Sequence, residues 1–311
     1  MKRAVRRVVR RLVPRVVPRL VPRLVVLGAL AAALGGACRN AADSAPAAGV
    51  LPHPLLWSAE KDGKTTYLFG TMHAGVDAAT RLPPIVWNKL DAAPAFAMEA
   101  DLDDPAAAAA IQPTASSLRD ELGDAYWQKL ETAIGAATAR AVEHLPPMVP
   151  AVALSTRGLP STPAMDKVLS ARAVGEHKPI VFLEPATRQL ALLGKWLDLR
   201  ALRMMLDDVP ANEQHARAML AAYVAGDDRK ILALGDDERA EALRHGYTAP
   251  EYDREMEELL YGRNASWIAA IEKLHDGGGG FVAVGALHLV GPRSVLDLLA
   301  QRSYHVARVV P

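Results

Sequence analysis

Short apolar runs, separated by glycine, proline and charged residues, recur along the chain after residue 54 and predict β-strands. Residues 55–59 and 65–69 are rich in β-favouring types and flank Asp62-Gly63, a dipeptide that favours a two-residue hairpin turn. The other runs predict strands at 95–98, 179–183, 281–284 and 304–309. The run at 179–183 contains no alternating polar positions, so we expect that strand to be buried.

Helical spacing of apolar residues occupies the intervals between these runs. It predicts helices that begin at Pro83-Pro84 and over residues 163–174, 186–197, 252–275 and 293–301. Two further segments, about 105–160 and 198–250, predict helical insertions; acidic pairs suggest breaks in the second one at 207–208, 227–228 and 236–237. The pattern therefore predicts a mixed α+β fold of the α/β type, with one central sheet, in a single domain over residues 55–311.

The longest predicted helix carries a charged residue on its apolar face. Arg263 fills the gap between Leu260 and Trp267 in a stripe that otherwise consists of apolar residues. A guanidinium on a buried stripe needs an anionic partner. We therefore expect Arg263 to balance an acidic cluster or to polarise a substrate carbonyl.

The net charge of +1 conceals a strong asymmetry along the chain. Nine basic residues lie within residues 1–23, before the first acidic residue, Asp43. Removing these nine from the 36 Lys and Arg leaves 27 against 35 Asp and Glu, a net charge of about −8. An acidic body of this kind is not typical of a protein that binds nucleic acid.

The basic start is the first part of a secretory signal over residues 1–37. An apolar stretch at 24–34 and the small residues at 35–37 complete it, and the apolar stretch is too short for a membrane-spanning helix. A flexible tether, 38–54, begins with Cys38, the only cysteine. Either Cys38 is lipidated or cleavage occurs further on, near Ala45 or Ala47. Both alternatives predict a protein of the periplasm or cell envelope, in contact with the membrane only through the signal region or a lipidated Cys38.

Four of the predicted strands are followed by a side chain that can bind a metal or accept a proton. His73 and His288 each follow a Gly-x-x-His pattern after a strand, and Glu99 and Glu184 follow two other strands. Asp101 faces the same side as Glu99 if the strand period of two continues. Because ligands of open α/β sheets gather at the carboxyl ends of strands, we expect these groups to share one site.

Two imidazoles and a carboxylate around a divalent cation form a common hydrolytic centre. The sequence thus suggests His73, His288 and one of the two glutamates as metal ligands, with an open position for water. A carboxylate, Glu99 or Glu184, would take the proton of that water, and Arg263 would support the reaction.

Each of these signals has an ordinary structural explanation when it stands alone. A lone Gly-x-x-His is more often a turn followed by a hydrogen-bonded histidine, Asp101 and Asp166 are more typical of surface or capping residues, and Gln189 of an ordinary helix position. Other chemistries lack their motifs: there is no Gly-x-Ser-x-Gly, no His-Glu-x-x-His and no phosphate loop. The recurrence at four strand ends favours the shared site.

In combination, these motifs resemble the TraB/PrgY/GumN family, which is related to the Tiki metalloproteases and to the erythromycin esterase and ChaN-like fold. The residues that carry the resemblance form five groups: Leu68 to His73, Glu99 with Asp101, Leu183 to Gln189, Arg263 with Asn264 and Trp267, and Val284 to Gly291. Pro185 stands where the family often has threonine.

The resemblance implies a metal-dependent hydrolase, and by Tiki-like activity a peptidase that acts on a peptide or protein. It implies manganese or cobalt, with zinc as a further choice, held by His73, Glu99 and His288. The remaining motif residues would support the site: Gly70, Thr71, Asp101, Gln189, Asn264 and Gly285. The alternative implied by TraB-like relatives is a non-catalytic protein that sequesters a peptide or signal.

Overall fold

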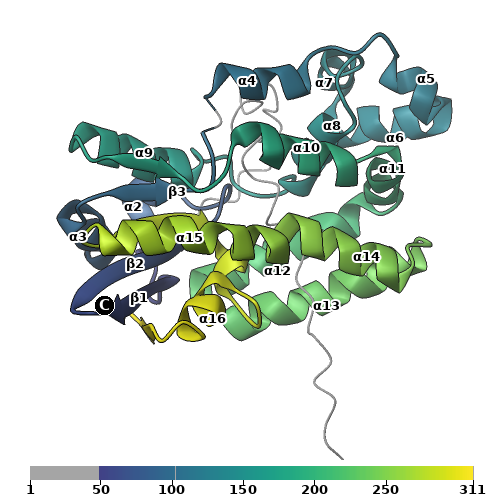
Figure 1. Cartoon of the computed structure of the whole chain (residues 1–311). Coiled ribbons are helices and arrows are strands. Elements are labelled where there is room, and N and C mark those ends of the chain that lie inside the picture. The colour runs from purple at the N-terminus through teal and green to yellow at the C-terminus, as the bar shows by residue number, and fades with distance from the viewer. Residues whose placement is uncertain (1–48, 102, 311) are drawn as a thin grey trace, which may run out of the picture.

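The computed structural model describes residues 49–101 and 103–310 (Figure 1). The predicted signal and most of the tether lie outside the described residues. In the described part of the chain, no helix combines the length and the apolar character that crossing a membrane requires.

One six-stranded mixed sheet forms the centre of the molecule, in the order β4-β3-β5-β2-β1-β6. The strands are β1 (Leu56–Lys61), β2 (Lys64–Thr71), β3 (Phe96–Met98), β4 (Ile180–Phe182), β5 (Gly280–Gly285) and β6 (His305–Arg308). From β4 to β2 the strands run parallel, whereas β1 pairs antiparallel with both β2 and β6. The parallel half therefore presents four carboxyl ends along one side of the sheet.

The hairpin between β1 and β2 confirms the turn predicted at Asp62-Gly63. Both residues have positive φ, 51° and 73°, which is the conformation that a tight two-residue turn requires and that Asp and Gly tolerate. This turn fixes the register, so Leu56 pairs with Phe69. The carboxyl end of β2, at Thr71, then lies beside Gly285, the carboxyl end of the parallel strand β5.

Helices surround the sheet and form a second lobe beside it (Figure 1). Those before β4 are α2 (Ala78–Arg81), α3 (Pro84–Ala92), α4 (Pro105–Ala108), η2 (Ala109–Ile111), α5 (Leu118–Leu122), α6 (Asp124–Ile134), α7 (Ala136–Ala141), α8 (Met148–Ser155) and α9 (Met165–Gly175). Those after β4 are α10 (Ala186–Trp196), α11 (Leu199–Asp207), α12 (Val209–Ala225), α13 (Asp228–Arg244), α14 (Ala249–Met256), the π-helical segment η3 (Glu257–Tyr261), α15 (Gly262–Asp276), η4 (Ala286–Leu289) and α16 (Val295–Ala300). The mixed fold class predicted from the sequence is confirmed.

Two apolar clusters lie beneath these layers. The larger one follows the sheet, where the ring of Phe281 packs against Phe69 and Phe96. The smaller one joins the helices of the first insertion to α10 and α11 through residues such as Trp127 and Leu202. The helical lobe therefore has its own apolar core, separate from the core of the sheet.

Two expectations about elements were wrong. The run at 179–183 was expected to be buried, but β4 is an edge strand, in which Ile180 and Val181 are half-buried and Phe182 is exposed, because only β3 pairs with it. The acidic pair 236–237 does not break a helix and lies within α13. The other two acidic pairs do mark helix starts, where Asp208 and Asp227 accept backbone N–H bonds from α12 and α13.

Candidate functional site

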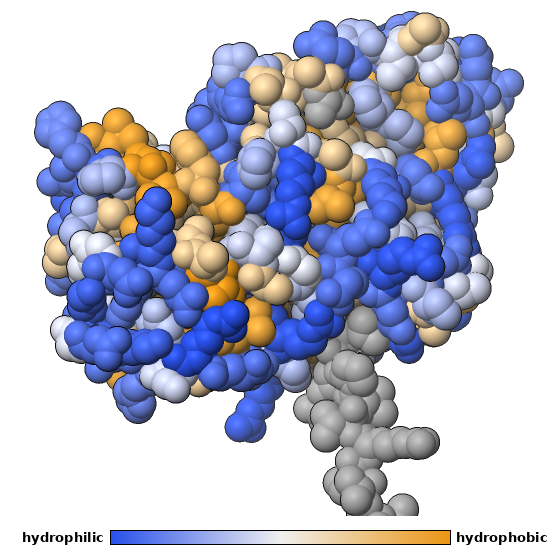
Figure 2. All heavy atoms as spheres, in the orientation of Figure 1, coloured by the Kyte–Doolittle hydropathy of each residue, from blue (hydrophilic) through white to orange (hydrophobic). Residues whose placement is uncertain are grey.

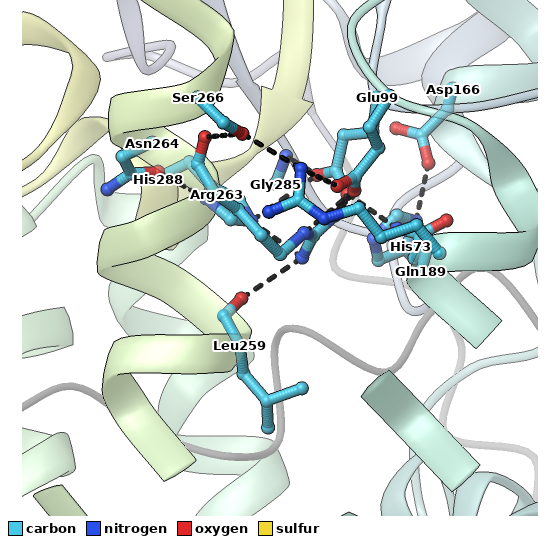
Figure 3. A network of polar contacts seen from close by, with 12 residues as sticks. His73, Glu99, Asp166, Gln189, Leu259, Arg263, Asn264, Ser266, Gly285 and His288 are labelled. Atoms are coloured by element: carbon cyan, nitrogen blue, oxygen red, sulfur yellow. Dashed lines mark hydrogen bonds and ion pairs between the residues drawn. The ribbon is translucent and has the colours of Figure 1, made fainter. Parts of the chain in front are cut away.

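Arg263 lies at the centre of a buried polar network at the carboxyl side of the sheet (Figure 3). Its Nε donates to Oε1 of Glu184 at 2.7 Å, and its Nη2 lies 2.7 Å from Oε2 of Glu99. The arginine side chain is 1% exposed. Its place on the apolar stripe of the predicted helix over 252–275 indicated this burial. A single guanidinium therefore pairs with two buried carboxyl groups, which supply the anionic partner that its position requires.

Sheet register brings the two glutamates together. Glu99 follows β3 and Glu184 follows β4, and the backbone N–H of Glu184 donates to the carbonyl of Glu99 at 2.9 Å. Strand β5 pairs with the other side of β3, so the N–H of Gly285 donates to Oε1 of Glu99 at 2.8 Å. Gln189, on the first turns of α10, donates to Oε2 of Glu99 at 2.8 Å. Glu99 is thus held by groups from three separate elements.

His288 is fully enclosed on η4, directly after β5. Its Nδ1 lies 2.6 Å from Oδ1 of Asn264, and its ring packs 4.4 Å from the ring of Trp267. Burial, opposed only in part by Glu99, lowers the pKa of His288 to about 3, so the ring is neutral. Since Oδ1 of Asn264 accepts the Nδ1 proton, the lone pair of His288 is on Nε2, which lies 3.6 Å from Oε1 of Glu99 and 3.4 Å from Nη1 of Arg263.

His73 has a partner that the sequence did not reveal. Its Nδ1 lies 2.5 Å from Oδ2 of Asp166, in the first turn of α9. Burial would lower the pKa of His73, but the carboxylate of Asp166 outweighs it and raises the pKa above the ordinary value. An imidazole that pairs with a carboxylate through Nδ1 keeps Nε2 for another partner.

The two glutamates differ in their readiness to hold a proton. Burial would raise the pKa of Glu99, yet the charge of Arg263 and its two histidine neighbours bring it down to about 2, so Glu99 is ionised. Burial raises the pKa of Glu184 and Arg263 offsets this only in part. Glu184 is therefore the carboxylate of the pair that more easily takes up a proton.

Several enclosed polar atoms of the site have no hydrogen-bond partner among the described residues. Among them are Nδ1 of His73, which faces Oδ2 of Asp166 as an ion pair at 2.5 Å, and four oxygen atoms: Oγ1 of Thr71, Oδ1 of Asp166, Oε2 of Glu184 and Oε1 of Gln189. Three of the four can only accept a hydrogen bond. Because an unpaired buried acceptor is costly, these atoms mark places where a donor or a cation from outside the chain would be stabilised.

An irregular turn in the long helix orients Arg263. The predicted helix over 252–275 is divided by η3, a π-helical segment that ends one residue before Gly262. Nη1 of Arg263 donates to the carbonyl of Leu259 in this segment at 3.1 Å. π-Helical turns release backbone carbonyls from the regular pattern, and such turns are frequent at functional sites.

The predicted supporting residues divide into two groups. Gln189, Asn264 and Gly285 contact the cluster directly. Gly70 and Thr71 end β2 close to it, and the carbonyl of Gly70 accepts from Tyr223 at 2.8 Å. The carboxylate of Asp101 accepts from the backbone N–H of Asp103, as an ordinary turn residue does.

Asp166 is the contributor that sequence reasoning set aside. An acidic residue in the first turn of a helix usually serves the helix itself, and its partner His73 lies 93 positions earlier in the chain. No local spacing links the two.

A shallow hollow of about 370 Å³ elsewhere, lined by Ala79, Trp87, Val168 and Arg172, includes none of the cluster residues.

The model of the TraB/PrgY/gumN family matches residues 55–308, a range that contains all six strands and every residue of the cluster. The chain belongs to the TraB/PrgY/gumN family.

Among the relatives of this family member are two uncharacterized proteins named YbaP. The one from Shigella flexneri is 25% identical over 241 residues, which cover 75% of this chain and 87% of the relative. The one from Escherichia coli (strain K12) is 25% identical over 240 residues, with the same coverage of both chains. No solved structure gave a significant match.

In this TraB/PrgY/gumN member, the donor atoms fit a cation in kind but do not form a complete set of ligands. In the described part of the chain, no three His, Cys, Asp or Glu side chains are arranged to hold a metal ion together. His288 Nε2 and Glu99 Oε1, 3.6 Å apart, are spaced so that bonds of about 2 Å could meet at one ion. Both histidines also have Nδ1 occupied, as metal-bound histidines usually do. The metal stays a prediction.

Proposed function

We propose that this protein is a hydrolase of the cell envelope that cleaves peptides or proteins and uses a divalent cation held by His73, Glu99 and His288. The observation that supports the proposal most is the pair of enclosed imidazoles, each held through Nδ1 by a partner, on either side of an ionised carboxylate. When bound, a divalent cation would supply Lewis acidity, which lowers the pKa of water. Manganese, cobalt and zinc are the candidates.

The chain's own residues divide the remaining tasks. Glu99 provides negative charge at a fixed place, because Gly285, Gln189 and Arg263 hold both of its oxygens. Glu184 can receive a proton on Oε2, which has no hydrogen-bond partner, and burial favours its protonated form. The charge of Arg263 allows Glu99 to remain ionised while Glu184 titrates.

One observation favours a second function, non-catalytic sequestration of a peptide or signal. Both oxygens of Glu99 already have partners within the protein, so this carboxylate is satisfied without any ligand. A carboxylate that is satisfied in this way can stabilise the fold without taking part in a reaction. The second function predicts stoichiometric binding without turnover.

Metal content and peptide cleavage, measured on the same preparations, test the proposal. The protein is dialysed against Mn²⁺, Co²⁺ or Zn²⁺, its bound metal is measured by mass spectrometry, and a mixture of unstructured octapeptides serves as substrate. We expect His73→Ala and His288→Ala to lose at least about tenfold in metal affinity and turnover. The matched control is His275→Asn, which changes a buried histidine that contacts Thr66 and Lys61 instead of the cluster. If both alanine variants keep wild-type metal content and cleavage, the proposal is wrong.

The envelope location is a separate part of the proposal. It is supported by the predicted signal over residues 1–37 and by Cys38, which lie outside the described residues. The mass of the mature protein distinguishes lipidation at Cys38 from cleavage near Ala45 or Ala47. A full-length protein recovered from the cytoplasmic fraction would contradict the location.

A further inference from the structure

We infer that the outer edge of β4 binds its substrate as an added strand, an extended peptide with an apolar side chain opposite Phe182. That the bound peptide is a substrate rests on the proposed function. Binding at this edge does not require catalysis. Strand addition to a sheet edge is a common mode of peptide recognition, in which main-chain hydrogen bonds supply the affinity.

The backbone of β4 has free groups on its outer side. Pro179 accepts from Phe96 and Leu183 donates to Met98, so the odd-numbered residues of this segment face β3. In a parallel ladder the intervening residues face the other way. The N–H and C=O groups of Ile180 and Phe182 therefore point away from β3, toward an edge that no strand of the described chain covers.

The β4 edge also lacks the usual protection against pairing. Charged side chains commonly guard exposed edges. On β6, the opposite edge of the same sheet, polar residues stand at both ends of the strand, His305 and Arg308, and Arg308 donates to the carbonyls of Pro54 and His53. β4 contains only Ile, Val and Phe, and the nearest lysine, Lys178, is turned away to bind the carbonyls of Asp91 and Ala93 at 2.6 and 2.8 Å.

Apolar surface accompanies this edge. Phe182 is 42% exposed and is the only aromatic residue among the large hydrophobic residues exposed in the described chain; Val174, at the end of α9, is another exposed member. Figure 2 shows apolar surface over the region of α9, on a face that is otherwise mostly hydrophilic. The edge therefore offers an apolar contact as well as backbone hydrogen bonds.

The edge leads into the candidate site. Glu184 follows Phe182 by two residues, about 7 Å along an extended chain. Gln189 lies one turn into the next helix, α10. Oε2 of Glu184 and Oε1 of Gln189 are buried acceptors without a hydrogen-bond partner among the described residues, although Nη1 of Arg188 lies 3.7 Å from Oε2 of Glu184. A peptide supplies one N–H donor per residue, whereas an added sugar or lipid would not supply them at this spacing. The outward N–H and C=O groups of Ile180 and Phe182, spaced as in a strand, favour a peptide as the occupant.

Two substitutions at one position test the inference. Phe182→Pro removes the outward N–H and the ring without breaking a bond to β3, since proline is tolerated on edge strands. Phe182→Ala removes the ring alone. Val306→Pro is the matched control on β6, because Val309 donates to Leu56 and residue 306 thus also faces outward. Thermal melting of each variant shows that it is folded.

Binding is measured separately from turnover. A fluorescein-labelled mixture of unstructured octapeptides is titrated with the full protein in EDTA and followed by fluorescence anisotropy, and cleavage is measured with added Mn²⁺. We expect Phe182→Pro to weaken binding at least about tenfold, Phe182→Ala about threefold, and Val306→Pro not at all. Binding lost by Phe182→Pro supports the inference even if no cleavage occurs, in which case only the proposed hydrolysis fails.

Three results overturn the inference. One is wild-type binding that Phe182→Pro leaves unchanged, whether or not peptides are cleaved. Another is the absence of any binding by the wild-type protein. The third is a wild-type dimer that Phe182→Pro converts to a monomer, because the occupant of the edge would then be a second copy of the chain.

Discussion

At the scale of single residues, Arg263 is the side chain on which the buried cluster depends. Replacing it with methionine would leave Glu99 and Glu184 enclosed without their counter-charge. We expect Arg263→Met to lower the free energy of unfolding by about 3–5 kcal/mol, since removing one partner of a buried ion pair exposes the other to its full desolvation cost. Urea denaturation at pH 7 measures this change.

The control for Arg263→Met is a second arginine–glutamate pair, between Arg293 in the turn before α16 and Glu257 of η3. Arg293 contacts Glu257 through both Nη atoms at 2.7 and 2.8 Å, but each side chain is 49% exposed. Arg293→Met should therefore cost less than about 1 kcal/mol. Equal costs for the two variants would contradict the idea that burial makes Arg263 essential.

Residue patterns predicted some of this cluster and missed the rest for a physical reason. The place of Arg263 on an apolar stripe follows from helical period, and the four strand-end groups follow from sheet geometry, so both were readable from local sequence. Asp166 was not readable, because it sits in a common capping position and gains its meaning only from contact with His73.

At the scale of elements, the π-helical segment depends on a small residue at its end. A Cβ built on Gly262 would lie 2.9 Å from the carbonyl oxygen of Glu257, closer than real contacts allow. We expect Gly262→Ala to destabilise the protein by about 1–3 kcal/mol, although alanine is the better helix former. Because the segment supplies the carbonyl of Leu259 to Arg263, this variant should also shift the arginine.

The matched control is Gly194, also within a helix. A Cβ there would lie 3.5 Å from Sδ of Met148, an ordinary contact. Gly194→Ala should therefore be neutral or stabilise by up to about 1 kcal/mol. Thermal or urea unfolding of both variants decides the matter: a stabilised Gly262→Ala would show that the π-helical segment is not required by the packing.

The presence of a strand or helix was easier to predict than the number of its neighbours or an irregularity within it. The Asp62-Gly63 hairpin depends on two adjacent residues and was predicted correctly. β4 was found but was wrongly expected to be buried, because apolar composition does not reveal whether a strand has one neighbour or two. The π-helical segment has no simple signal in the apolar period, since the stripe continues across it.

At the scale of the whole molecule, the enclosed cluster makes stability sensitive to acid. The pKa of His288 is about 3 in the folded protein against an ordinary value of 6.5, and that of Glu99 is about 2 against 4.5. Both pKa values are lowered by folding, so each group contributes stability that is complete above its ordinary pKa and is lost as the pH falls toward the folded value. The raised pKa of His73 acts the other way, and its contribution is lost as the pH rises above 6.5.

The two lowered pKa values act in separate pH windows, which allows each to be tested alone. Between about pH 6 and 5 His288 takes up a proton on unfolding, which should lower the free energy of unfolding by about 1.4 kcal/mol per pH unit, and below about pH 4.5 Glu99 should add a similar slope. Burial also lowers the pKa of His215 and raises that of Glu184, so the contribution of His288 is the difference in slope between the wild type and a His288 variant. Urea denaturation of the metal-free protein across this range measures both slopes. His288→Asn should flatten the first and Glu99→Gln only the second. An unchanged slope between pH 6 and 5 in His288→Asn would mean that the ring is not held neutral by its burial beside Arg263.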